Sequence, residues 1–266
     1  MFSMRSLLEI VSAVGVSILL SILALKSIRW TGADLKDFKQ RNRVDVLSIA
    51  ALFNLMFIAG VGLLLHFWEH APLHALGFRL HSKDLAFVLL VNVISAGVAV
   101  LFLRALHRAD KVDFQWNPGT FSGWRGILSS SLGFLVLFIA ALQEEVLFRG
   151  YFTFVLRPYG FWFCLIISTL TFTFWHFLTN KVSLLQTVDW VLGGFMLFLI
   201  YWWTGSVWMA ALIHFGRNMI NVVLFNISGQ NALFKFDHPI LPAQKSIFTA
   251  IYTLLIICLT ASVYGA

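Results

Sequence analysis

Hydrophobic residues run along this chain in long stretches, and most polar and charged residues lie between those stretches. About 20 consecutive apolar residues are needed for a helix to cross the hydrocarbon core of a bilayer. Stretches of about this length predict eight transmembrane helices, near residues 6–26, 46–68, 85–106, 130–157, 161–180, 186–203, 206–227 and 245–264. We therefore expect an all-α fold, a polytopic membrane bundle in which residues 1–266 form a single integral-membrane domain.

The composition supports a membrane protein and argues against an ordinary soluble domain. Hydrophobic residues make up 59% of the chain, charged residues 12%, and the mean hydropathy is +0.85. A soluble domain usually carries about 25% charged residues. Both cysteines, Cys164 and Cys258, fall within apolar stretches, so we expect small hydrophobic side chains without a disulfide framework.

The positive charge of the chain indicates its orientation in the membrane. The net charge is +7, and many of the basic residues lie after the first and third predicted spans, in 26–45 and 104–125. Basic loops usually stay in the cytoplasm, so we expect both termini on the opposite side. No basic stripe with interleaved aromatic residues occurs in a soluble segment, which argues against nucleic-acid binding. We expect a multi-pass protein of the plasma membrane, with the lipid bilayer as its surroundings.

Three ionisable residues interrupt the fourth predicted span. Glu144, Glu145 and Arg149 lie in an otherwise apolar run, where one charge at the centre of a spanning helix costs about 2.5–3.5 kcal/mol. Glu145 and Arg149 stand at i and i+4, so they can pair along one helix face. Glu144 points about 100° away from Glu145 and must face another partner.

Further polar residues are predicted at a similar depth on neighbouring helices. The fourth and fifth spans meet at the helix-breaking turn 157–160, and Glu144 and His176 each lie roughly 20–23 Å from it along their helices. His214 and Asn218 share one face of the seventh span and lie about 12 and 18 Å from its start on the same side. We therefore expect four polar side chains from three helices to converge near the middle of the membrane.

These residues resemble the three motifs of the type II CAAX prenyl protease family, also called CPBP for CAAX proteases and bacteriocin-processing enzymes. The matching patterns are Glu144-Glu145-x-x-x-Arg149, Phe172-x-x-x-His176 and His214-x-x-x-Asn218. The resemblance covers the segment 130–226, which we take as the family-like catalytic core. It implies an intramembrane endopeptidase that hydrolyses a peptide bond of a membrane-associated protein or peptide, prenylated or not.

The resemblance also implies a role for each motif residue. Glu144 would act as the general base on a water molecule, aided by His176, and His214 and Asn218 would stabilise the oxyanion. A carboxylate in a low-dielectric cavity and amide or imidazole N–H donors suit these tasks. Glu145 would pair with Arg149 as structural support for the site, and Phe172 is expected to serve in packing.

The same residues admit a metal-dependent mechanism. Glu144, His176 and His214 make up a His₂Glu set, the kind that binds catalytic zinc with one position left for water. The metal-free mechanism, without a cofactor, is favoured because no further carboxylate in the spans would be available as the base if Glu144 bound zinc.

One residue departs from the family pattern. Arg217 lies between His214 and Asn218, where we expect a small or apolar residue. Its direction differs by about 60° from that of His214, so it can border the same cavity. We expect it either to pair with Asp189 of the sixth span or to bind a carboxylate of the substrate.

Other patterns and functions compete with this interpretation. His66, Glu69 and His70 match the H-x-x-E-H pattern of inverted zincins, but at the end of the second span they are expected to be interfacial polar residues. A membrane immunity or accessory protein could use the same fold without catalysis. A proton-coupled transporter could use the buried carboxylate and imidazole groups as a relay.

Overall fold

The computed structural model describes residues 3–35, 37–117, 123–178, 182–226 and 232–265. The ends of two predicted spans, at 179–180 and 227, lie outside these described residues. Within them, seven helical segments are long and apolar enough to cross a membrane: α1 (Met4–Trp30), α3 (Val44–Phe67), α4 (Ser82–Arg108), Gly126–Tyr159, α8 (Leu184–Thr204), Val207–Leu224 and α10 (Pro242–Tyr264). A shorter apolar helix, α7 (Phe161–Phe177), completes the set, and the predicted polytopic helical bundle is confirmed.

Two of these segments change their winding along their length. The first consists of α5 (Gly123–Glu145), the π-helical turn η3 (Val146–Tyr151), α6 (Phe152–Leu156) and the 3₁₀ turn η4 (Arg157–Tyr159). The second consists of α9 (Val207–Met219) and a π-helical turn, η5 (Ile220–Leu224). The remaining described helices are short: α2 (Phe38–Arg41) and η1 (Leu73–Leu76). π-Helical turns within α-helices are rare and often occur at functional sites.

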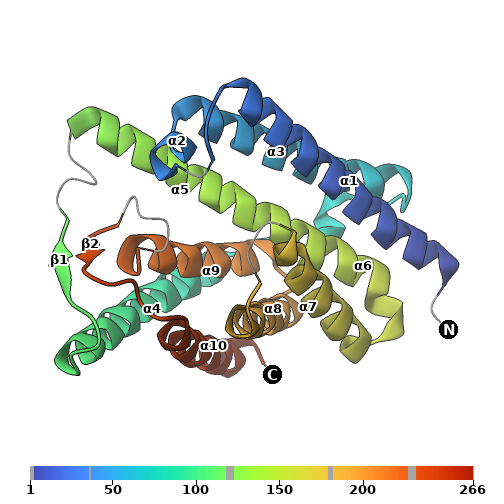
Figure 1. Cartoon of the computed structure of the whole chain (residues 1–266). Coiled ribbons are helices and arrows are strands. Elements are labelled where there is room, and N and C mark those ends of the chain that lie inside the picture. Colours follow the sequence, from blue (N-terminus) through green and yellow to red (C-terminus); the bar gives the residue numbers. More distant parts are fainter. Residues whose placement is uncertain (1–2, 36, 118–122, 179–181, 227–231, 266) are drawn as a thin grey trace.

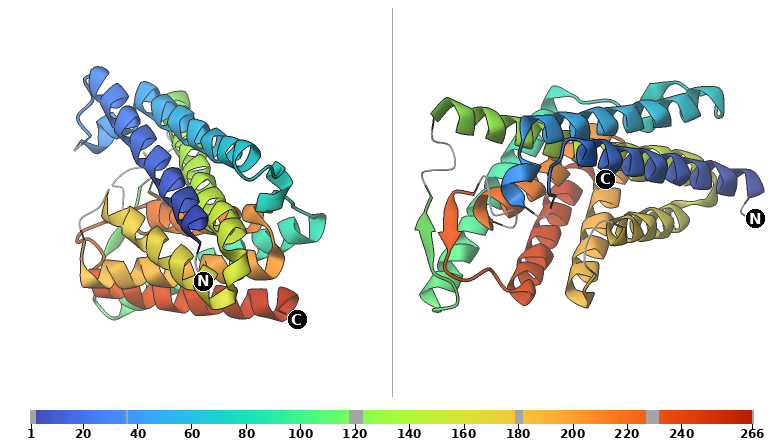
Figure 2. Two further views of the ribbon diagram at one scale, coloured as in Figure 1. Left: turned by 90° about the vertical axis from the view of Figure 1, so that its right-hand side faces the viewer. Right: turned by 45° about the horizontal axis from the view of Figure 1, so that its top comes forward.

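The helices form a bundle around α9 and α8. Figure 1 shows α1, α3 and α5 lying alongside one another, with α9 packed between α5 and α4. On the other side, α8 packs against both α7 and α10, and the two further views in Figure 2 show the same grouping. The helices that carry the three motifs, α5, α7 and α9, therefore meet in the interior of the bundle.

The side chains follow the pattern of a protein immersed in lipid. Large apolar residues are exposed on the outer faces of the helices, as with Leu52, Leu63, Leu89 and Leu101. Inside the bundle, Glu145 and Arg149 are completely buried. Because apolar faces gain little from associating within lipid, packing and buried polar contacts must hold these helices together.

Serine caps determine where two of the central helices begin. The Ser183 side chain accepts a hydrogen bond from the backbone N–H of Gln186 at the start of α8. Ser206 does the same with Met209 at the start of α9. These contacts satisfy backbone donors that the first turn of a helix leaves unpaired.

A small two-stranded sheet joins two loops and was not predicted from the sequence. Strands β1 (Phe114–Trp116) and β2 (Phe234–Phe236) pair antiparallel, with Phe114 opposite Phe236 and Trp116 opposite Phe234. Three residues are too few to show an alternating pattern of hydrophobicity, so no sequence signal could have identified either strand.

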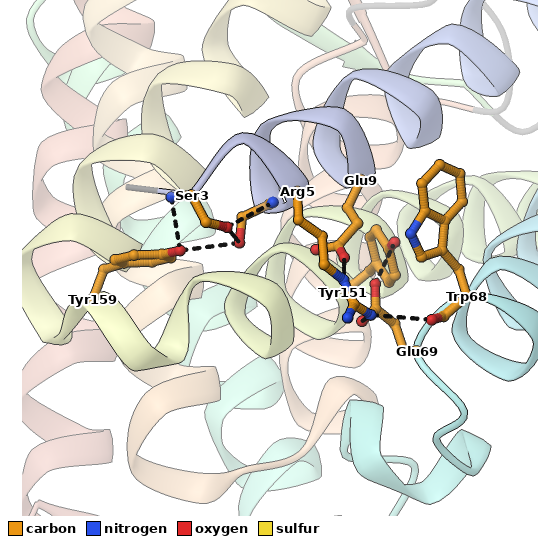
Figure 3. Close-up of polar contacts among 8 residues, drawn as sticks. Ser3, Arg5, Glu9, Trp68, Glu69, Tyr151 and Tyr159 are labelled. Atoms are coloured by element: carbon orange, nitrogen blue, oxygen red, sulfur yellow. Dashed lines mark hydrogen bonds and ion pairs between the residues drawn. The ribbon is translucent and has the colours of Figure 1, made fainter. Parts of the chain in front are cut away.

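Polar contacts attach the N-terminal helix α1 to the rest of the bundle (Figure 3). Arg5 forms an ion pair of 2.6 Å with Glu9 and another of 3.4 Å with Glu69, which follows α3. Arg5 also donates to the carbonyl oxygen of Trp68 at 3.2 Å. The hydroxyl of Tyr151, at the end of η3, donates to the Glu69 carboxylate at 3.3 Å. Helix α1 is therefore connected to the helix that carries the first motif.

Candidate active site

The two adjacent glutamates of the first motif are the last residues of α5. The chain then continues into the π-helical turn η3, which contains Arg149. A π-helical turn widens the helix and disturbs its regular hydrogen bonds, so side chains from neighbouring helices can bind the backbone there. Ser168 of α7 does so, donating its hydroxyl to the carbonyl oxygen of Phe148 at 2.8 Å. This hydrogen bond to the π-helical turn holds α7 against the segment that carries the first motif.

Glu145 forms the expected ion pair with Arg149. The Nε atom of Arg149 lies 3.2 Å from Oε2 of Glu145, and its Nη1 donates to Oε1 at 3.2 Å. Arg149 also donates from Nη2 to the carbonyl oxygen of Gly194 on α8, at 3.0 Å. Its guanidinium lies over the ring of Phe172, 4.3 Å from the centroid. A buried charge needs such compensation, and here the contacts join α5, α7 and α8.

Glu145 has a second partner that the sequence did not suggest. Nδ1 of His214, on α9, lies 2.8 Å from Oε1 of Glu145. On its other side, Nε2 of His214 lies 3.9 Å from Oε2 of Glu144. His214 therefore stands between the two glutamates. A carboxylate that binds one ring nitrogen of a histidine fixes the orientation of the ring, and with it the direction of the other nitrogen.

Glu144 is oriented differently from Glu145, as its position on the helix required. Its side chain is 19% exposed, whereas that of Glu145 is fully buried. The Oε2 atom of Glu144 is nevertheless buried and has no hydrogen-bond partner among the described residues. Leaving a buried carboxylate oxygen unpaired is costly, so this atom is suited to contact a water molecule or a substrate.

His176 lies near the end of α7, and its ring is also fixed. Its Nδ1 is 2.9 Å from the carbonyl oxygen of Phe172. Because a carbonyl oxygen can only accept a hydrogen bond, Nδ1 must carry the proton. The His176 ring also packs against Phe172 at 4.7 Å and Trp190 at 5.1 Å between centroids.

Phe172 packs against three of the polar motif residues. Its ring contacts Arg149, His176 and His214, the last at 6.0 Å between ring centroids. A side chain at Gly194 would come within 3.2 Å of this ring, so the glycine lets α8 approach. The spacing of the second motif gave Phe172 and His176 as neighbours, but it could not show that the ring also contacts Arg149 and His214.

A cavity of about 330 Å³ opens beside these residues and is lined by His176, His214 and Asn218. Polar side chains from the beginnings of α8 and α10 line it as well, among them Gln186, Asp189 and Lys245. Glu144 does not line this cavity, but it lies 3.9 Å from His214, which does. The structure thus brings Glu144 next to His214, and His176 and Asn218 line the same cavity as His214.

Of the two expectations for Arg217, the ion pair with Asp189 is absent among the described residues, and binding of a substrate carboxylate stays a prediction. Arg217 donates instead from Nη1 to Asn221 at 2.5 Å and from Nη2 to Thr249 of α10 at 2.7 Å. Its guanidinium also lies over the rings of Phe248 and Tyr252, at 4.9 and 5.3 Å. These partners, which no motif identifies, hold Arg217 against α10. Asp189 and Arg217 both line the cavity without forming an ion pair with each other in the described structure.

Zinc binding by Glu144, His176 and His214 stays a prediction. No group of three or more His, Cys, Asp and Glu side chains in the described part of the chain is arranged to hold a metal ion. Within this set, Nε2 of His214 lies 3.9 Å from Oε2 of Glu144, and its Nδ1 binds Glu145, as the outer nitrogen of a zinc-bound histidine often binds a carboxylate. Zinc ligation would require nitrogen and oxygen atoms about 2.0–2.2 Å from a common centre.

The H-x-x-E-H pattern does not form a helical zinc motif either. Helix α3 ends at Phe67, so His66 lies in its last turn while Glu69 and His70 follow it. Glu69 is bound by Arg5 and Tyr151, and His70 has a positive φ of 53°. The three residues therefore do not share one helix face, and Glu69 serves as an anchor for α1.

Comparison with known proteins identifies the part of the chain that carries the motifs. Residues 125–220 match the family model described as "Type II CAAX prenyl endopeptidase Rce1-like". No curated protein and no solved structure matches the chain. The matched segment contains all three motifs. It includes α7, which carries the second motif, and α8, which lies between the second and third motifs. The chain is a multi-pass membrane protein, and its segment 125–220 is similar to the type II CAAX prenyl endopeptidase family.

Proposed function

We propose that this protein is an intramembrane endopeptidase in which Glu144 activates water against a peptide bond of a membrane-associated protein or peptide. One observation carries the proposal. Glu144 and His214 face each other across 3.9 Å, and the other nitrogen of His214 is bound by Glu145. This separation is too long for a direct hydrogen bond but allows both atoms to contact one water molecule.

The protonation of His214 follows from its partners. An ionised Glu145 can only accept a hydrogen bond, so Nδ1 of His214 carries the proton. In the neutral ring, Nε2 then has a lone pair and faces Glu144. His214 is thereby suited first to orient the attacking water, and to donate from Nε2 only after it has gained a proton. This differs from the role of simple oxyanion donor that the family resemblance implies.

The reaction then needs one proton to move twice. Glu144 takes a proton from the water as its oxygen attacks the carbonyl carbon of the scissile bond, which yields a tetrahedral intermediate. The intermediate's oxygen carries the negative charge, and the amide N–H of Asn218 on the cavity wall is suited to stabilise it. Glu144 returns the proton to the amide nitrogen as the C–N bond breaks, with His176 beside the cavity as a second proton-accepting group.

Several features of the cavity bear on the substrate. Its polar part, with Gln186, Asp189 and Lys245, lies between the beginnings of α8 and α10. Such a lining can accommodate the polar backbone of an extended peptide as it enters the bundle. The substrate we propose is therefore a peptide segment at the membrane surface, and prenylation is left as a variable of the experiment.

The proposal is tested with the purified full-length chain in lipid nanodiscs. Cleavage of a farnesylated peptide and of its unmodified counterpart is followed by mass spectrometry, with and without a zinc chelator. We expect Glu144→Gln to lower kcat by about 10²–10⁴-fold, the usual contribution of a general base. The matched control is Asp113→Asn, which removes an exposed carboxylate outside the motifs and is expected to retain activity.

Each outcome distinguishes the competing functions. Full activity of Glu144→Gln would contradict the proposed base. Loss of wild-type activity on chelation, with recovery on adding zinc, would support a metal mechanism instead. A non-catalytic immunity or accessory protein would keep its phenotype in Glu144→Gln. A proton-coupled transporter would show uptake driven by a pH gradient and no cleaved peptide.

A further inference from the structure

A second cavity, of about 340 Å³, lies apart from the candidate active site and shares no lining residue with it. It is formed where three connections meet: the α3–α4 connection, the turn between α6 and α7, and the turn between α8 and α9. Successive antiparallel helices place these connections at the same end of the bundle. The cavity therefore lies where the helices leave the hydrocarbon region.

The lining of this cavity is positively charged. Arg79 and Arg157 contribute to it together with His74, and no aspartate or glutamate is among the described lining residues. In a protein with so few charges, two arginines around one cavity without a carboxylate indicate a site for an anion.

Arg79 is held in place by the backbone. Its Nε donates to the carbonyl oxygen of Gly205 at 3.1 Å and its Nη2 to that of Thr204 at 3.3 Å. Gly205 has a φ of 59°, which favours glycine, and a Cβ atom there would meet Nη2 of Arg79, so a side chain at this position would displace the guanidinium. A guanidinium has five N–H donors. Two are used here, and the remainder can bind a ligand.

Arg157 and Thr153 supply further donors. The Arg157 side chain forms no hydrogen bond or ion pair with the residues that the structure describes, although it lies at the end of a membrane span. Thr153 is only 3% exposed, and its hydroxyl has no partner within the described ranges. A buried hydroxyl without a partner is rare in a folded protein and calls for a ligand or a water molecule. Both residues line the cavity.

Aromatic residues indicate where the ligand comes from. Trp202 and Trp203 line the same cavity, with Phe154 beside them. Tryptophan is enriched where membrane proteins meet the lipid head groups. We propose that this cavity binds the phosphate of an anionic phospholipid, with Arg79 and Arg157 contacting the phosphate oxygens and the Thr153 hydroxyl donating to one of them. This site is independent of the proposed peptidase activity.

The test uses the full-length chain in a neutral detergent. Phosphatidylglycerol, phosphatidylcholine and inorganic phosphate are titrated separately, and bound lipid is counted by native mass spectrometry. We expect phosphatidylglycerol to bind several-fold more tightly than phosphatidylcholine. Arg157→Gln should weaken its binding about fivefold, as one basic residue near the head groups contributes. Arg157→Lys should retain more of the affinity.

Lys83→Gln is the matched control, because Lys83 is another exposed cation near the beginning of a span but does not line the cavity. It should leave the affinity unchanged, and peptidase activity and thermal stability should be unaffected in Arg157→Gln. Equal binding of the two lipids would overturn the proposal. So would an equal loss in Lys83→Gln, or inorganic phosphate binding as tightly as phosphatidylglycerol.

Discussion

Glu145 combines two tasks at the level of a single side chain. It compensates the buried charge of Arg149, and it orients His214 by binding Nδ1 at 2.8 Å. The sequence spacing revealed the first task through the i and i+4 positions. It could not reveal the second, because that contact joins residues 69 positions apart.

Removing the Glu145 carboxylate should therefore affect both stability and activity. We expect Glu145→Leu to lower the free energy of unfolding by about 3–5 kcal/mol, since Arg149 would keep a buried charge without its partner. Combining Glu145→Leu with Arg149→Met should restore most of the stability, because both charges are then gone. Activity should stay low in the double variant, because His214 still lacks its partner. Recovery of activity there would show that Glu145 acts through Arg149 alone.

At the scale of helices, the π-helical turn η3 connects the motif to the end of the bundle. It contains Arg149, which contacts α8, and Tyr151, which contacts Glu69 beyond α3. Glu69 in turn binds Arg5 of α1 (Figure 3). This one turn thus contacts α8 directly and is connected to α1 through Glu69.

This arrangement predicts a pH-dependent stability centred on Glu69. Burial and, secondarily, the negative charge of Glu9 raise the pKa of Glu69 above its usual 4.5. The folded state then binds more protons than the unfolded state between the two pKa values, so stability falls as the pH rises through that range. Arg5 and Tyr151 oppose the shift in part. We expect thermal unfolding of Glu69→Gln in detergent to depend less on pH above about 4.5 than that of the wild type. Identical pH profiles would contradict this role.

At the scale of the whole molecule, the sequence predicted the membrane bundle well because a span requires a long apolar stretch. The approach of Glu144 to His214 also agrees with the predicted match in depth, since helix rise and turn position determine depth. The rotation of each helix about its axis depends on tertiary packing. For this reason the sequence did not show that Phe172 contacts both Arg149 and His214, or that Arg217 would bind Thr249 rather than Asp189.

The sequence also could not predict features that form where separate connections of the chain meet. The cavity with Arg79 and Arg157 combines residues from three connections, and neither arginine belongs to a motif. The strands β1 and β2 are likewise defined by a pairing between distant loops. In both cases the structure depends on contacts between segments that share no local signal.

The most direct test of the central claim is to follow the oxygen of the attacking water. The full-length wild type and Glu144→Gln are incubated with a membrane-bound peptide substrate in ¹⁸O-labelled water, and the products are analysed by mass spectrometry. We predict one ¹⁸O atom in the new C-terminal carboxylate of the wild-type product, and almost no product from Glu144→Gln. Equal amounts of labelled product from both proteins would contradict the assignment of Glu144 as the residue that activates water.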